Sequence, residues 1–186
     1  GEAISTDRWL PLIKEVMTPI SEYATIAEDQ ILFDAFQILE QESASSGRTH
    51  RDLIVLGEDG QLKGKVTMLD IFRALEPKYK KLYKNYNDRT LTKDNVLKAI
   101  RDFDLWLAPV KDLCQRGSHI RISDVMHIPE PWEHIQEDES LEKALHEYVM
   151  GVHQPLIVKR NDRVTGILRF EDLYEVVKKH MLACRV

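Results

Sequence analysis

The chain has 186 residues and a formal net charge of -5, because 31 acidic residues outnumber 26 lysines and arginines. A hydrophobic content of 43% is enough for a packed core and excludes a disordered chain. No apolar run of about 18 residues occurs, so no membrane-spanning helix is predicted, and no secretory signal is recognised. The acidic balance argues against bulk binding of nucleic acid, which needs a basic face. Cys114 and Cys184 form no CxxC pattern, and we expect a reducing, cytoplasmic location.

The sequence contains an internal duplication, which is the first sign of its organisation. Glu15-Val16-Met17 is matched by Asp124-Val125-Met126 at an offset of 109 residues, which is 126 minus 17. Ile26-Ala27-Glu28-Asp29 is matched by Ile135-Gln136-Glu137-Asp138 at the same offset. Each copy continues with apolar residues at steps of three and four, and this spacing predicts an amphipathic helix.

The second half of each copy also matches. The apolar runs Leu53–Leu56 and Leu156–Val158 each predict a buried strand. A polar turn then leads to a third strand, which ends in Gly64-Lys65-Val66-Thr67 or in Gly166-Ile167-Leu168-Arg169. Another helix follows. Each copy is therefore predicted to run strand, helix, strand, strand, helix, which gives a mixed α/β (α+β) fold built twice.

We expect four segments along the chain. They are an N-terminal helix over residues 1–15, a first repeat over 16–75, a helical linker over 76–120 and a second repeat over 121–186. The first repeat is the longer one. We expect its extra residues in a polar, serine-rich loop over residues 42–51, because surface loops tolerate insertions.

The repeated pattern resembles a known family. The order Val-Met-Thr-Pro, acidic-led helix, apolar strand and Gly-x-Val-Thr-x-x-Asp is similar to the CBS domain, and two copies resemble a CBS pair, or Bateman module. The stretch Gly64–Asp70 carries the resemblance most closely, and the resemblance extends over residues 17–75 and 124–182. It implies two copies packed about a pseudo-two-fold axis, a non-enzymatic regulatory role, and commonly a homodimer. It also implies an adenosine ligand between the copies: AMP, ADP, ATP or S-adenosylmethionine.

The end of the third strand has the chemistry for such a ligand. A carboxylate can accept hydrogen bonds from both hydroxyls of a ribose, and Asp70 and Asp172 occupy matching positions there. The hydroxyl of Thr67 could bind a phosphate, and the free amides of a helix start favour an anion. The resemblance implies an adenine slot lined by the first and second strands, with Thr25, Ile54 and Ile157 as candidate residues.

Two alternatives remain open at these positions. Thr67-x-x-Asp70 is also the pattern of a helix cap, which needs no ligand. Arg169 replaces the threonine in the second copy. Its guanidinium could bind a phosphate in a forked geometry, or it could fill its own cleft or bind a carboxylate across the two repeats. The two sites are therefore expected to differ, and the one at Asp70 is the better candidate.

We therefore predict a non-enzymatic regulatory module that senses an adenosine compound and modulates a protein partner or its own homodimer. The competing hypothesis is a ligand-free platform for dimerisation or protein interaction. A third hypothesis places a small enzyme in the linker. No catalytic constellation and no metal site can be argued from residue spacing, and we expect no required cofactor, nucleic acid or membrane partner.

Overall fold

The structure, a computed structural model, describes residues 10–47, 51–76, 79, 94, 96–98, 101 and 110–184. The chain divides into two compact units. The continuous unit takes the described residues of 24–127, and the discontinuous unit takes residues 10–23 together with 128–184. Most of the linker predicted over 76–120, and most of the N-terminal helix predicted over 1–15, lie outside the described residues. Among the described helices, none combines the length and the apolar character that crossing a membrane requires.

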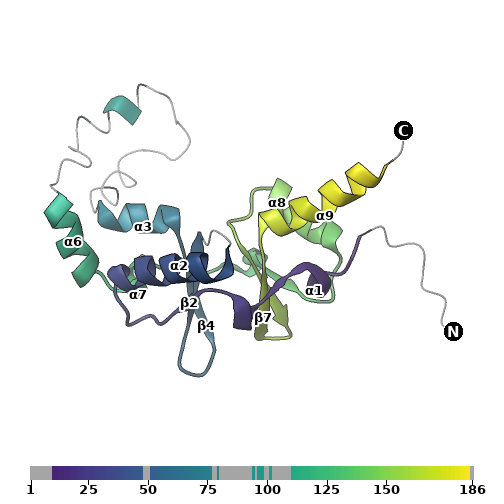
Figure 1. Ribbon diagram of the computed structural model, residues 1–186, viewed down its shortest axis with the longest axis horizontal. Coiled ribbons are helices and arrows are strands. Elements are labelled where there is room, and N and C mark those ends of the chain that lie inside the picture. The colour runs from purple at the N-terminus through teal and green to yellow at the C-terminus, as the bar shows by residue number, and fades with distance from the viewer. Residues whose placement is uncertain are drawn as a thin grey trace. The chain divides into compact units, whose positions relative to one another are not determined.

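The continuous unit contains a three-stranded sheet in the order β2-β3-β4. Its strands are β2 (Thr25–Ile26), β3 (Asp52–Leu56) and β4 (Leu62–Thr67). β2 is parallel to β3, and β3 is antiparallel to β4. The helices of this unit include α2 (Leu32–Ser46), α3 (Met68–Leu75), α6 (Val110–His119) and α7 (Ile122–Val125), as Figure 1 shows.

The discontinuous unit contains a four-stranded sheet in the order β1-β7-β6-β5. Its strands are β1 (Thr18–Pro19), β5 (His134–Gln136), β6 (Leu156–Arg160) and β7 (Arg163–Leu168). β5 is parallel to β6, and β7 is antiparallel to both β6 and β1. Its helical elements are α1 (Ile13–Val16), α8 (Leu141–Val149), α9 (Phe170–Ala183) and the 3₁₀ turns η1 (Ile20–Glu22) and η2 (Pro131–Glu133).

The predicted order of elements is confirmed in both copies. One copy runs β2-α2-β3-β4-α3 and the other runs β5-α8-β6-β7-α9. Even an irregularity is repeated, since the register shifts between Val55 and Leu56 in one copy and between Val158 and Lys159 in the other. The mixed α/β fold class is therefore also confirmed.

The loop predicted over residues 42–51 is wrong at its start, because α2 continues to Ser46. The hydroxyls of Ser45 and Ser46 donate to the carbonyl of Glu42, at 3.3 and 2.7 Å, so these polar residues bond within the helix. Gly47 then ends the helix with a left-handed φ of 67°. Since α2 has 15 residues and α8 has nine, most of the insertion lengthens a helix.

One face of each sheet packs against the apolar stripes of its helices. In the continuous unit the core joins Leu32 and Ala35 of α2 to Val55 and Val66 of the sheet, and α3 and α7 contribute Ile71 and Ile122. In the discontinuous unit the core is formed by α1, α8, α9 and the strands, and its fully buried members include Ile13, Leu141, Leu156, Val158, Leu168 and Leu173. The amphipathic helices predicted from residue spacing are therefore present.

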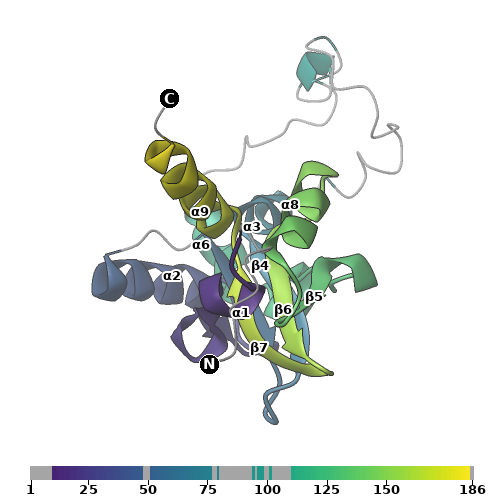
Figure 2. The same cartoon turned by 90° about the vertical axis from the view of Figure 1, so that its right-hand side faces the viewer.

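Each repeat docks the segment that precedes its first strand onto the unit that holds the other repeat. Both views in Figures 1 and 2 show α1 beside β7, far from it in the sequence. The docking bonds form two pairs related by the 109-residue offset: Ile13 N–H to Glu139 O (3.1 Å), Lys14 N–H to Glu137 O (2.8 Å), Ile122 N–H to Gln30 O (2.8 Å) and Ser123 N–H to Glu28 O (2.9 Å). The compact units therefore do not begin and end where the sequence repeats do.

This exchange explains the glycine in β7. β1 pairs with β7, with Thr18 opposite Ile167. A Cβ atom added at Gly166 would lie 2.5 Å from Met17 Sδ and 2.7 Å from Thr18 O. Only a residue without a side chain allows the Val-Met segment to approach so closely.

The same contact recurs in β4 with slightly more room. Lys65 and His127 exchange two backbone hydrogen bonds, of 2.9 and 2.8 Å. A Cβ atom added at Gly64 would lie 2.9 Å from Met126 Sδ and 3.0 Å from His127 O. The close approach of the Val-Met segment is a sufficient reason for this glycine.

We expect Gly166→Ala to destabilise the chain by about 1–3 kcal/mol, because overpacking forces neighbouring atoms to move. Gly64→Ala should cost less, since its nearest contacts are longer. The free energy of unfolding is measured in urea from the midpoint at constant slope. Gly117→Ala is the control, because an added Cβ there meets nothing within 4 Å. A Gly166→Ala chain as stable as the Gly117→Ala chain would contradict this account.

Tyr148→Phe tests a buried hydrogen-bond bridge. The Tyr148 hydroxyl donates to Leu168 O at 2.5 Å and accepts from Leu156 N–H at 3.0 Å. Phenylalanine removes both hydrogen bonds from a buried site, so we expect a loss of about 1–3 kcal/mol in the free energy of unfolding. Tyr174→Phe is the control, since Tyr174 is 58% exposed. Equal stability of the two variants would show that the bridge contributes nothing.

Candidate functional site

The candidate site consists of two strand–helix junctions at matching positions of the repeats. The Asp70 junction comprises residues 67–70, where β4 ends and α3 begins. The Asp172 junction comprises residues 169–172, where β7 ends and α9 begins. The two are separated by 102 residues, which is 172 minus 70. Each junction lies within a single unit, the first in the continuous and the second in the discontinuous one.

In the Asp70 junction, Thr67 and Asp70 cap α3 reciprocally. The Thr67 backbone N–H and the Thr67 hydroxyl both donate to Asp70 Oδ2, each at 2.9 Å. The Asp70 backbone N–H donates to Thr67 Oγ1 at 3.2 Å. The helix-cap alternative is therefore confirmed as a structural role of these two residues.

The cap engages one side of the Asp70 carboxylate. All of its bonds to the carboxylate end on Oδ2, and among the described residues no hydrogen bond to Oδ1 is found. Asp70 is 8% exposed, so its carboxylate is held in place and largely shielded from water. A fixed carboxylate with one oxygen left as an acceptor retains the capacity to bind a hydroxyl group.

The residues predicted to line an adenine slot lie in the adjacent strands. Thr25 of β2 stands opposite Ile54 of β3, and Ile54 stands opposite Lys65 of β4. Thr25, Ile54 and the strand leading to Thr67 therefore share one sheet. In the other repeat Ile157 of β6 stands opposite Ile167 of β7. Ile54 and Ile157 expose no surface, so contact with a ligand requires a neighbouring group to move.

In the Asp172 junction, Arg169 takes both oxygens of the carboxylate. Its Nη2 donates to Asp172 Oδ1 at 3.1 Å, its Nε donates to Oδ2 at 3.4 Å, and its backbone N–H donates to Oδ2 at 3.0 Å. The two side chains are 16% and 14% exposed. Of the roles considered for Arg169, the structure shows a carboxylate contact, and the carboxylate belongs to its own repeat.

The surroundings of Arg169 favour its charged form. Burial by itself lowers the pKa of the guanidinium, but the hydrogen bond and charge of Asp172 outweigh burial and raise this pKa above its usual value. Tyr23 and Glu171 act in the same direction, and Glu171 Oε2 lies 3.8 Å from Arg169 Nε. The ion pair with Asp172 therefore keeps the guanidinium in its charged form.

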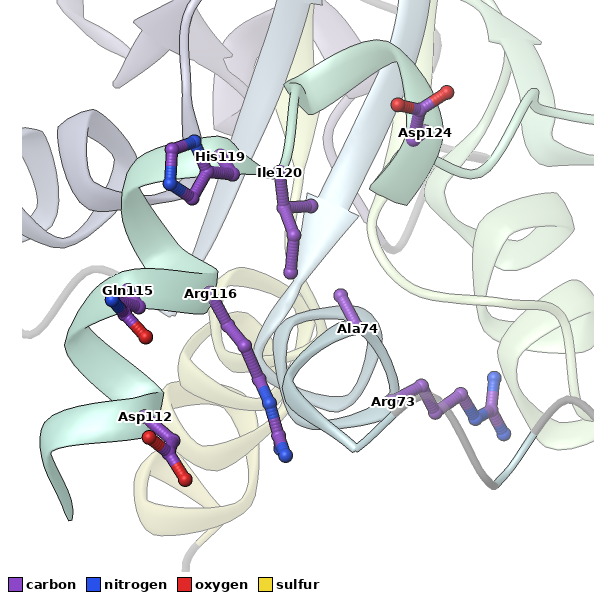
Figure 3. A pocket seen from close by; sticks show the side chains of 8 residues that line it. All are labelled: Arg73, Ala74, Asp112, Gln115, Arg116, His119, Ile120 and Asp124. Atoms are coloured by element: carbon purple, nitrogen blue, oxygen red, sulfur yellow. The ribbon is translucent and has the colours of Figure 1, made fainter. Parts of the chain in front are cut away.

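The continuous unit also has a pocket of about 680 Å³ among α3, α6 and α7, which sequence reasoning missed. Figure 3 shows its eight lining side chains, and their polar ends do not converge. Arg116 reaches toward α3, where its Nη1 donates to the carbonyl of Leu75 at 2.7 Å, while Arg73 and His119 point away from it. Among these eight side chains, no group of polar atoms meets at one point, so they do not form a candidate ligand site.

Known families and structures resemble the chain. Residues 13–77 match the family model of the CBS domain. No curated protein matches the chain. Similar solved structures include a CBS domain-containing protein of unknown function from Bacillus anthracis str. Ames Ancestor, with 14% identity, a TM-score of 0.60, and coverage of 91% of this chain and 94% of that one.

The plant protein CBSX2 is similar to the chain in the same way. The CBS-pair protein CBSX2 from Arabidopsis thaliana has 15% identity and a TM-score of 0.60, over 93% of this chain and 98% of that one. A structure of CBSX2 in complex with AMP has 16% identity and a TM-score of 0.59, over 91% and 98%. Likeness at these identities concerns the fold alone. Residues 13–77 thus match the CBS domain family model, and the chain has the fold of a CBS-pair protein.

Proposed function

We propose that the chain is a regulatory, non-catalytic CBS-pair module that binds an adenosine compound at the Asp70 junction. The compound is AMP, ADP, ATP or S-adenosylmethionine. The observation that carries this proposal is the Asp70 carboxylate, which the cap fixes through Oδ2 while Oδ1 makes no hydrogen bond with the described residues. The AMP complex of CBSX2, a protein of the same fold, supports the choice of ligand class.

Each residue of the junction has a separate role in this proposal. Asp70 Oδ1 accepts a hydrogen bond from a ribose hydroxyl, as carboxylates do in other nucleotide sites. Thr67 and the first amides of α3 face a phosphate, which the helix start favours. Thr25 and Ile54 line the adenine slot. In the other repeat, Asp172, Arg169 and Ile157 are the corresponding residues.

We further propose that ligand binding modulates a homodimer or a protein partner through α2 and α3. Large apolar side chains on these two helices are 45–54% exposed: Phe33, Phe36, Met68, Leu69 and Phe72. Exposed aromatic and methionine side chains are typical of the centre of protein interfaces. Met68 and Leu69 lie between Thr67 and Asp70 in the sequence, so a ligand at the junction and a protein on this surface share the first turn of α3.

The same surface also supports the second candidate, a ligand-free platform for dimerisation or protein interaction. In that case the Thr67–Asp70 bonds serve only to cap α3. The apolar side chains then need a protein partner but no nucleotide. Ligand binding separates the two functions, because the platform has no adenosine site.

The test is thermal unfolding of the chain with AMP, ADP, ATP, S-adenosylmethionine and NAD. A ligand present at about 100 times its dissociation constant adds about 2.7 kcal/mol to the free energy of unfolding, and the midpoint rises. We expect an increase with at least one adenosine compound. If none of the five raises the midpoint, the ligand-free platform is the better account.

Variants of Asp70 locate the site. Asp70→Ala should abolish the ligand-induced increase, and Asp70→Asn should do so while keeping an oxygen that can accept from Thr67. Asp34→Asn is the matched control, because Asp34 accepts from the backbone N–H of Ile31 at 3.1 Å and so caps α2 of the same unit in the same way. Unchanged affinity in the Asp70 variants would remove this residue from the site.

A further inference from the structure

We propose that Arg169 is an autoinhibitory contact: it keeps the Asp172 junction closed, so that the chain binds one adenosine ligand where a duplicated site could bind two. This inference rests on the function proposed for the Asp70 junction. It concerns the position at which the two junctions differ in their capping residue, threonine at 67 and arginine at 169.

The two carboxylates differ in how many acceptor positions remain. Binding the two hydroxyls of a ribose requires a carboxylate with open acceptor sites. In the Asp70 junction all the cap bonds to the carboxylate end on Oδ2. In the Asp172 junction Oδ1 accepts from Arg169 Nη2, and Oδ2 accepts from both Arg169 Nε and the backbone N–H. Of the about four acceptor sites of a carboxylate, only one then remains at Asp172, so a ribose cannot place both hydroxyls there unless the guanidinium moves.

The Arg169–Asp172 pair resists this displacement for three reasons. The bond joins two charged groups in a forked arrangement, which is stronger than a bond to a neutral hydroxyl. The partners are three residues apart in the chain, so little entropy is lost in bringing them together. Both side chains are less than one fifth exposed, at 16% and 14%, so water screens the pair weakly. A neutral ribose supplies no charge to replace either partner.

The difference between the two junctions also indicates which substitution would open the Asp172 junction. Arg169→Thr introduces the residue found at the matching position of the other repeat. A threonine there is a favourable residue at a helix start, and its hydroxyl and amide engage one carboxylate oxygen in the Asp70 junction. Asp172 Oδ1 would then be released. A gain of ligand binding is a result that mere loss of a structural ion pair does not produce.

The test is calorimetric titration of the full chain with AMP. We expect one AMP per wild-type chain and two per Arg169→Thr chain, with Arg169→Ser as a second opening variant. Asp70→Asn should bind none, Asp70→Asn/Arg169→Thr should bind one, and adding Asp172→Asn should remove that one. Arg160→Thr is the control, since it removes the same charge from the same unit. Arg160 is 71% exposed and pairs with Glu137 outside the junction.

The outcomes separate this inference from the proposed function. Two AMP per wild-type chain, or one AMP in both opening variants, would overturn the inhibitory role of Arg169 and leave the Asp70 site standing. No AMP on the wild type but one on Arg169→Thr would support that role and refute the Asp70 site. A second AMP bound equally by Arg160→Thr would assign the gain to net charge, which contradicts the inference. Absence of binding in every variant, when AMP, ADP, ATP and S-adenosylmethionine are each titrated, would refute both.

Discussion

The close docking of each Val-Met segment against a third strand is the contact on which both units depend. It places Ile13 in one core and Ile122 in the other, each fully buried. It needs a glycine at its closest point, because backbone oxygen and methionine sulfur occupy the volume that a Cβ would take. In each repeat the candidate junction begins three residues after that glycine, at Thr67 after Gly64 and at Arg169 after Gly166.

The difference between the junctions therefore lies in their side chains and not in their backbone. Both have an acidic residue at the third helical position that accepts from the capping residue's own N–H, at 2.9 Å in one and 3.0 Å in the other. This capping bond by itself accounts for an acidic residue at the position, whether or not a ligand binds there. The cap does not require that one carboxylate oxygen stays without a hydrogen bond from the protein. Among the described contacts, Thr67 leaves one carboxylate oxygen without a hydrogen bond and Arg169 leaves none, and in the proposed function this one difference decides whether the cap can also bind a ligand.

Sequence reasoning recovered the order of strands and helices, because buried strands and amphipathic helices have a local period. It could not recover which sheet the Val-Met segments join, since their pairing with residues such as Ile167 depends on distant parts of the chain. For the same reason the sequence could not show that Gly166 makes room for Met17 and Thr18. The partner of Arg169 was also undetermined, because a guanidinium can bind a phosphate or a carboxylate, or fill its own cleft, and its rotamer decides among them.

The position of Met68 and Leu69 gives the proposed regulation a physical basis. These side chains are 45% and 54% exposed, and they belong to the helical turn that Thr67 and Asp70 close. A protein that packs on them changes the free energy of the turn, and a ligand on Asp70 does the same. Coupling between two binding sites is reciprocal. A ligand that strengthens an interface there must therefore itself bind more tightly to the assembled form, and by the same factor.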